Sequence, residues 1–128
     1  MPSASKAPSQ RMLQVGEEVR HALSEIFLRG ECHAMELEGI SITVSQVRMS
    51  PDLKQATAYI ATLYSFDVEA LLPVLNKHHE KTIRKLLASR LKLKYLPSLH
   101  FRADYSFDEA QKIHRLLAAT GDTDQDPD

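Results

Sequence analysis

Residues 77–102 read KHHEKTIRKLLASRLKLKYLPSLHFR, and this stretch sets the expectations for the rest of the chain. It holds eight Lys and Arg but a single acid, Glu80, which gives it a formal charge of +7. Because the whole chain of 128 residues has a net charge of −1, the remaining residues are acidic as a group. The net charge therefore conceals a polarised molecule.

A helix over residues 80–91 would have two different faces. Four apolar residues recur at helical spacing and predict one buried stripe: Ile83, Leu86, Leu87 and Leu91. The cations project from the opposite side: Lys81, Arg84, Lys85 and Lys92. A merely soluble helix usually mixes acids and bases four residues apart, and this one hardly does. The pattern therefore favours a surface that binds a polyanion over an ordinary solvated helix face.

The bulk composition is typical of a single soluble domain. With 43% apolar residues, 128 residues suffice for one core. The lone Cys32 can form no internal disulfide, which favours a reducing cytoplasm. No run approaches the roughly 18 to 20 apolar residues of a membrane span, and the start lacks the apolar core of a signal peptide. The start is also too short and too poor in Arg for an organelle transit peptide, so we expect a cytoplasmic protein.

The residues before this stretch predict a helix and a hairpin. The helix has a regular apolar stripe: Met12, Val15, Val19, Leu23, Ile26 and Phe27. Gly30 is placed to cap its end. Residues 40–49 and 55–63 are prone to form strands, with a slip in the alternation near Gln46 that indicates a bulge. A turn at 50–52 separates them, so we expect the two strands to pair antiparallel.

The rest of the apolar pattern predicts two more helices, a third strand and a short last helix. The first of these helices has its own stripe: Val68, Leu71, Leu72 and Leu75. Pro73 falls within the stripe, so the regular helix should start or bend beside it. We expect this helix to meet the basic helix at a kink in the polar junction 76–80. Pro97 should end the helical region, residues 99–105 alternate as a strand, and residues 107–117 carry the last amphipathic stripe.

These elements define one α+β domain with two flanking segments. Residues 11–118 form the expected domain, in the order α-β-β-α-(kink)-α-β with a short C-terminal helix. Residues 1–10 are rich in Ser, Ala and Pro and should be a disordered arm. Residues 119–128 should be a disordered acidic tail, because they have almost nothing to bury.

The element order resembles the type II KH fold, in which helices cover one face of a three-stranded mixed sheet. Three stretches resemble ribosome-binding factor A of bacteria: VSQVRMSPDLKQATAYI, TIRKLLASRLKLKYLPSLHF and DYSFDEAQKIHRLL. That family has a strand ending in a Val-x-Met-Ser-x-Asp-Leu-like corner, a helix of Ile-Arg-x-Leu-Leu type and a Pro-x-Leu-x-Phe entry to its last strand. The resemblance covers roughly residues 11–117.

The resemblance implies a non-enzymatic assembly factor that binds the small ribosomal subunit, promotes late maturation of its rRNA and matters for growth in the cold. We expect a cytoplasmic monomer with no cofactor, no small-molecule substrate and no membrane partner. KH domains that hold single-stranded RNA use a Gly-x-x-Gly loop between two helices, and the family has an Ala-x-Gly kink there. Residues 76–82 read NKHHEKT instead. Without glycine the backbone approaches phosphate less closely, so recognition should rely on side chains and shape.

The candidate RNA-binding residues are the cations and histidines of the basic stretch, together with two cations that flank the turn of the hairpin. They are Lys77, His78, His79, Lys81, Arg84, Lys85, Lys92, Lys94, Arg48 and Lys54. The alternative for the turn pair is an ordinary solvated turn, since only a docked subunit would reveal a contact. Tyr95 and Phe101 are the only aromatic platforms of the basic stretch, so base reading should be modest.

Two features of the basic stretch, a polar cluster and Arg90, have simpler structural explanations. The cluster His78-His79-Glu80 could suggest a metal site, but the helical motif needs a second His four residues after the first, where Ile83 stands. Polar residues filling a junction are the simpler explanation. Arg90 falls on the apolar side, and its stem should pass the rim of the core to place its charge in water.

Two other classes of function stay open from the sequence. A protein-interaction module could dock its basic helix on an acidic partner, and binding that survives nuclease treatment would favour it. An RNA-processing enzyme would need paired carboxylates or a metal site, and the part of the chain expected to be ordered offers neither.

Overall fold

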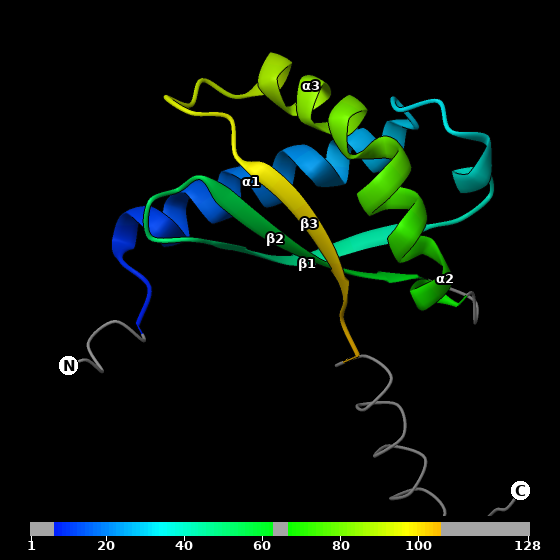
Figure 1. Cartoon of the computed structure of the whole chain (residues 1–128), viewed down its shortest axis with the longest axis horizontal. Coiled ribbons are helices and arrows are strands. Elements are labelled where there is room, and N and C mark those ends of the chain that lie inside the picture. The colour runs from blue at the N-terminus through cyan, green and yellow to red at the C-terminus, as the bar shows by residue number, and fades with distance from the viewer. Residues whose placement is uncertain (1–6, 63–66, 106–128) are drawn as a thin grey trace, which may run out of the picture.

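The computed structural model describes residues 7–62 and 67–105 (Figure 1). Its elements are α1 (Gln10–Arg29), the short 3-10 turn η2 (Met35–Leu37), β1 (Ile42–Met49), β2 (Gln55–Thr62), α2 (Val68–Pro73), η3 (Val74–His79), α3 (Glu80–Arg90) and β3 (Ser98–Ala103). This order confirms the predicted succession of helices and strands. The predicted C-terminal helix, the acidic tail and residues 1–6 lie outside the described residues.

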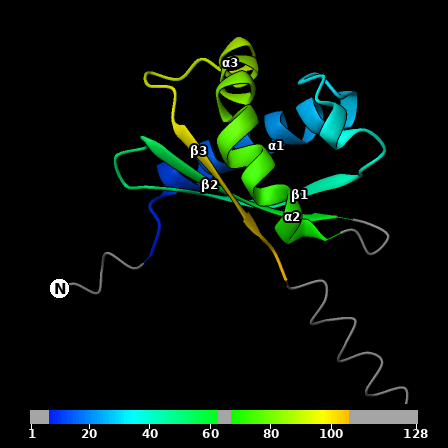
Figure 2. The same ribbon diagram turned by 45° about the vertical axis from the view of Figure 1, so that its right-hand side comes forward.

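The strands form one mixed sheet in the order β1-β2-β3. β1 and β2 pair antiparallel as predicted, and β2 and β3 pair in parallel. The register shifts between Val44 and Gln46, so the predicted bulge is confirmed at Ser45. The Ser45 hydroxyl donates a hydrogen bond to the carbonyl oxygen of Tyr59 at 3.2 Å. The helices α1 and α3 lie on the same face of this sheet (Figure 2).

Helix α1 packs its predicted stripe against the sheet. Val19, Leu23 and Ile26 are fully buried, and their burial is the main source of stability for this layer. Gly30 ends the helix with a φ of 62°, a left-handed conformation that suits glycine, and so confirms the predicted cap. Gly16 lies where α1 packs closely against the sheet. An added Cβ would lie 2.7 Å from the carbonyl oxygen of Val47, so a larger residue would not fit without a shift of the backbone.

The predicted kink between the second and third helices is a π-helical segment. The chain stays helical from α2 through η3 into α3, and the wide turn begins directly after Pro73. The side chain of Asp67 caps the start of α2 by accepting a hydrogen bond from the Glu69 N–H at 3.0 Å. The regular α-helix therefore begins before Pro73, and the wider π-helix begins directly after it. Irregular helical turns commonly occur beside proline.

The end of α3 differs from the prediction. The helix ends at Arg90, so the prediction that Pro97 ends the helical region is wrong. Leu91 is already extended, with φ −123° and ψ 143°. From Leu91 to Lys94, partly buried leucines alternate with exposed lysines, which is the period of an extended segment rather than of a helix.

Helix α3 and strand β3 complete the core. Ile83 and Leu87 are fully buried, as the apolar stripe predicted, whereas Leu86 is only partly buried. Phe101 of β3 is 1% exposed and meets the ring of Phe27 edge to face, with ring centres 6.0 Å apart. This aromatic contact joins α1 to the last strand of the sheet.

Candidate nucleic-acid interface

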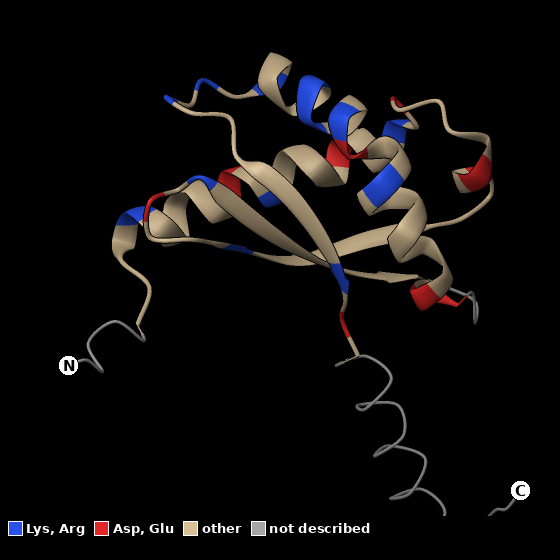
Figure 3. Cartoon of the chain, in the orientation of Figure 1, with Lys and Arg blue, Asp and Glu red and all other residues tan. Residues whose placement is uncertain are grey.

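Three exposed lysines, Lys77, Lys81 and Lys85, follow one another at four-residue steps from η3 along α3. We call these three residues the lysine ridge. Figure 3 shows the concentration of Lys and Arg along α3 and in the segment after it. Within residues 7–62 and 67–105, every ion pair uses Arg or His, and none uses Lys. The ridge is therefore available to an external anion.

Arg84 has a partner inside the protein. Its Nε lies 3.6 Å from the carboxylate of Glu80, and the Arg84 side chain is 33% exposed. The same carboxylate accepts a hydrogen bond from the backbone N–H of Leu99 at 2.9 Å. The one acid of the basic stretch thus connects α3 to β3 and holds Arg84 beside it, which leaves Arg84 less available than the lysines of the ridge.

Asn76 makes a second connection to β3. Its side-chain amide donates to the carbonyl oxygen of Phe101 at 3.0 Å, and its side-chain oxygen accepts from the Phe101 N–H at 2.7 Å. The two side-chain bonds take the place of a neighbouring strand along this edge of the sheet. Sequence reasoning missed both Asn76 and Glu80, because nothing local marks residues that pair with a strand about twenty positions away.

The two histidines of the junction differ in their surroundings. The Nε2 of His79 lies 3.1 Å from a carboxylate oxygen of Glu36, and the His79 side chain is 18% exposed. A backbone N–H and the His79 hydrogen bond together hold the pKa of Glu36 below its ordinary value. His78 is exposed. In the part of the chain that the structure describes, no group of three or more potential ligand residues could hold a metal ion.

Arg90 joins the ends of α1 and α3. Its guanidinium donates to Glu25 at 2.7 Å and also to Glu31. The bond to Glu31 and the charge of both carboxylates raise the pKa of Arg90. The head group therefore lies between two acids that are distant from it in the sequence, and these partners were not part of the prediction for Arg90.

Lys54 and Lys94 both lie near the same exposed aromatic ring. Their Nζ atoms lie 5.3 and 5.6 Å from the ring centre of Tyr95, which is 53% exposed. Such distances allow cation–π attraction. A small cavity of about 180 Å³ adjoins this cluster, and Arg11 of α1 is among its lining residues. The hairpin turn and the segment after α3 therefore form a second basic patch, which we call the tyrosine cluster.

The ten predicted residues do not form one continuous patch. His78 directly follows Lys77 of the lysine ridge and is exposed. Lys92 is exposed in the segment after α3. Arg48 lies on β1, opposite Thr57, and points away from the helices. Phe101, expected to be an aromatic platform, is buried and cannot serve as one. The structure thus offers several cationic surfaces, of which the lysine ridge is the most regular.

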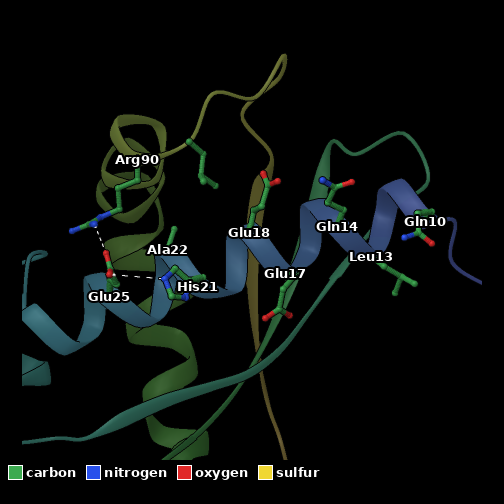
Figure 4. Close-up of a pocket in the computed structure, with 10 residues that line it drawn as sticks. Gln10, Leu13, Gln14, Glu17, Glu18, His21, Ala22, Glu25 and Arg90 are labelled. Atoms are coloured by element: carbon green, nitrogen blue, oxygen red, sulfur yellow. Dashed lines mark hydrogen bonds and ion pairs between the residues drawn. The ribbon is translucent and has the colours of Figure 1, made fainter.

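A groove among the described residues has the wrong charge for RNA. It is a groove of about 850 Å³ along the outer side of α1 (Figure 4). Its lining includes one arginine, Arg90, and three carboxylates: Glu17, Glu18 and Glu25. Their negative charge repels phosphate, so a polyanion should bind elsewhere.

Among the described residues, no helix is long and apolar enough to span a membrane.

Proteins of known sequence resemble this chain along most of its length. The family model described as ribosome-binding factor A matches residues 11–117. A protein of that name from Bradyrhizobium diazoefficiens is 47% identical over 123 residues, which are 94% of this chain and 85% of the relative. Another of that name, from Agrobacterium fabrum, is 51% identical over 116 residues, which are 90% of this chain and 83% of the relative.

Solved structures show the same architecture. The crystal structure of ribosome-binding factor A from Thermus thermophilus matches with a TM-score of 0.59 at 25% identity, over 72% of this chain and 94% of that one. A model of the Thermus thermophilus factor, fitted into a cryo-electron-microscopy map of a 30S complex, has a TM-score of 0.57 at 23% identity and covers 70% of this chain and 91% of that one. These matches confirm the predicted type II KH-like fold class. The chain belongs to the ribosome-binding factor A family.

Proposed function

We propose that this protein is a non-catalytic assembly factor that binds the small ribosomal subunit through its rRNA. It promotes late maturation of that RNA, contributes to growth in the cold and acts in the cytoplasm as a monomer. Membership of the ribosome-binding factor A family supports the proposal, as does the fold shared with the factor fitted into the 30S complex. Within this chain's own structure, the lysine ridge is the strongest support for the proposed function.

The ridge supports binding to RNA because it presents positive charge that nothing in the described protein neutralises. Lys77, Lys81 and Lys85 are exposed, and none of them forms an ion pair with a described residue. Each lysine that reaches a phosphate releases bound counterions, which favours association. The lysines project from the continuous helical path of η3 and α3, so the spacing of their backbone positions is set before RNA binds.

The junction between α2 and α3 supports recognition by shape rather than by a short base sequence. In η3 the backbone is wound as a π-helix, and Asn76 points its amide at β3. A backbone loop that cradles phosphate needs N–H groups that point outward, and a helical segment uses them internally. RNA contact should therefore come from side chains on the surface of a folded RNA.

Gradient sedimentation of a lysate tests the proposal. We expect the protein to sediment with free small subunits and to leave that position after the RNA is digested. A protein that stays at the top of the gradient would contradict the proposal. Association that survives complete digestion would identify a protein partner instead.

A ridge variant localises the contact. Replacing Lys77, Lys81 and Lys85 with Gln should weaken binding to purified small subunits and lower the salt slope of log affinity by about 2, because three phosphates lose their cations. Replacement with Arg at the same positions is the matched control and should preserve binding. Both variants should melt like the wild type, since exposed substitutions usually change stability by less than about 0.5 kcal/mol.

A further inference from the structure

The sheet has a second face that the described helices leave uncovered (Figure 1). Side chains alternate along each strand, so one half of them points away from the helices. The central members of that half are Gln46, Arg48, Thr57, Tyr59, His100 and Arg102. We call these six residues the underside. Within the bounds of the three strands there is no Asp or Glu, so the charges of the underside itself are positive; Asp104 directly follows β3, and its carboxylate accepts a hydrogen bond from Ser45 of β1.

Tyr59 lies at the centre of the underside. It belongs to the middle strand, where it pairs with Gln46 of β1 on one side and Arg102 of β3 on the other. Arg48 and His100 lie in the adjacent row and are therefore diagonal to it. Directly opposite side chains in a sheet are about 5 Å apart at Cβ, and diagonal ones about 7 to 8 Å. The ring thus has a guanidinium group within reach on both sides.

The charges of the underside have no partner among the described residues. Arg20, Arg84 and Arg90 all form ion pairs, whereas Arg48 and Arg102 form none. Both are exposed, and Tyr59 is partly exposed. A sheet face that only needs to be soluble usually carries charges of both signs, which stabilise each other across strands. None of the six residues of the underside supplies the negative half of such a pair, and the neighbouring acid, Asp104, bonds to the Ser45 hydroxyl.

We propose that the underside binds single-stranded RNA, with a base stacked on the ring of Tyr59 and phosphates held by Arg48 and Arg102. This inference rests on the proposed function, because it takes RNA as the ligand. An aromatic ring accepts any base, since every base has a flat π face. The planar, forked guanidinium group suits phosphate oxygens. The underside therefore contributes affinity for an unpaired segment without reading its sequence.

The geometry favours a single strand over a duplex or an acidic peptide. Bases in a duplex are stacked on one another, so their faces cannot reach a ring on a protein surface. An acidic peptide would neutralise the two arginines but would leave the ring of Tyr59 without a specific contact. Only an unpaired nucleotide supplies a flat ring and an anion a few ångströms apart.

Two variants at one position test the stacking. The full-length protein would be titrated, by fluorescence anisotropy at one low salt concentration, with eight-nucleotide oligouridylate and oligoadenylate. Tyr59→Leu should weaken binding of both by about 5- to 100-fold, the usual range for losing one stacked base. Tyr59→Phe keeps the ring and should bind within about twofold of the wild type. Photocrosslinking with 4-thiouridine should label the β2 peptide that contains Tyr59.

A second variant keeps the test informative if Tyr59→Leu fails to fold. Replacing Arg48 and Arg102 with Gln leaves the ring in place. It should reduce the salt slope for the oligonucleotides by about 1.4, because two phosphates of a single strand lose their cations. Arg29→Gln, which removes an exposed cation at the end of α1, outside the underside and the lysine ridge, is the matched control and should leave this salt slope unchanged.

The outcomes separate this inference from the proposed function. Absence of oligonucleotide binding by the wild type, equal binding by a folded Tyr59→Leu variant, or crosslinks confined to other elements would each overturn the role of the underside. If the protein still sediments with small subunits in those cases, the proposed function stands. If it does not sediment with them at all, the proposed function fails, whatever the oligonucleotides do.

Discussion

The two sides of α3 use charge in opposite ways. On the side that meets the rest of the molecule, Arg84 pairs with Glu80, and Arg90 reaches the acids at the end of α1. On the outer side, Lys81 and Lys85 are exposed and unpaired within the described residues. One basic helix therefore contains two kinds of cation, one that holds the fold together and one that is left for a ligand.

The division follows the chemistry of the two side chains. The guanidinium group is planar and carries five donors, so Arg90 can bind two carboxylates at once. The lysine ammonium group is strongly hydrated and sits on a flexible stem, which suits an exposed contact with phosphate. Counting Lys and Arg together as positive charge, as a sequence analysis does, conceals this difference.

The largest effect should come from the buried side of α3. Leu87→Ala should lower the free energy of unfolding by about 2 to 5 kcal/mol, because it removes buried methyl groups and leaves a cavity. Lys85→Ala, two positions earlier on the exposed side, should change it by less than about 0.5 kcal/mol. Urea denaturation of the two variants measures the contrast, and similar losses for both would mean that the lysine side also supports the fold.

The next largest effect should come from Asn76, which covers the edge of β3. Asn76→Leu leaves the N–H and carbonyl of Phe101 without their partner, which should cost about 1 to 3 kcal/mol. Thr82→Ala, at an exposed position of α3, is the control and should be nearly neutral. Hydrogen exchange at Phe101 should quicken in the Asn76 variant alone. Unchanged exchange would show that the side-chain bonds do not protect this edge.

A smaller effect is expected for Arg90→Gln, which breaks the contact between α1 and α3. The pairs are partly exposed, so the loss of stability should be smaller than that of Asn76→Leu. Arg29→Gln, at an exposed position of the last turn of α1, should have almost no effect. Thermal melts at low and high salt check the electrostatic origin, because about 1 M salt should shrink the difference. A difference that salt leaves unchanged would indicate packing of the Arg90 stem instead.

The smallest effect concerns the dependence of stability on pH at Glu36. Since the folded protein lowers the pKa of this carboxyl below its ordinary 4.5, its contribution is fully present above that value. The contribution is lost as the pH falls through the lower pKa of the folded state. Glu36→Gln should therefore be slightly less stable than the wild type near neutral pH and equal to it in strong acid. Glu38→Gln serves as the control, and identical pH profiles for all three proteins would contradict the assignment.

The elements of the fold were predictable because their apolar periods are clear. The stripe of α1, the bulge at Ser45 and the antiparallel hairpin were all expected from spacing alone. The end of α3 was not, because LKLK after Arg90 continues the cationic pattern of the helix while alternating with the period of a strand. In the structure Leu91 and Leu93 both pack against the core, and alternate residues can do so in an extended segment but not on one face of a helix.

The candidate site was predictable only in part. Exposure of the lysines followed from the helical period, since it depends on neighbours along the chain. The partners of Arg90 and Asn76 lie 65 and 25 positions away, so no local pattern could reveal them. Tyr59 was missed for the same reason. Its strand had been assigned, but the residues that flank it come from the register of three strands.

The π-helical turn also sets the rotational phase of α3. Leu71 and Leu87 are both buried, yet in a regular helix residues so far apart would differ by about 160° around the axis. A π turn behaves like one inserted residue and removes about 100° of that difference. Both leucines then face the sheet. Rewinding the same residues, Val74–His79, as a regular α-helix would instead rotate α3 by about 100° and carry the lysines toward the core, so the winding of the junction determines which way the lysines face.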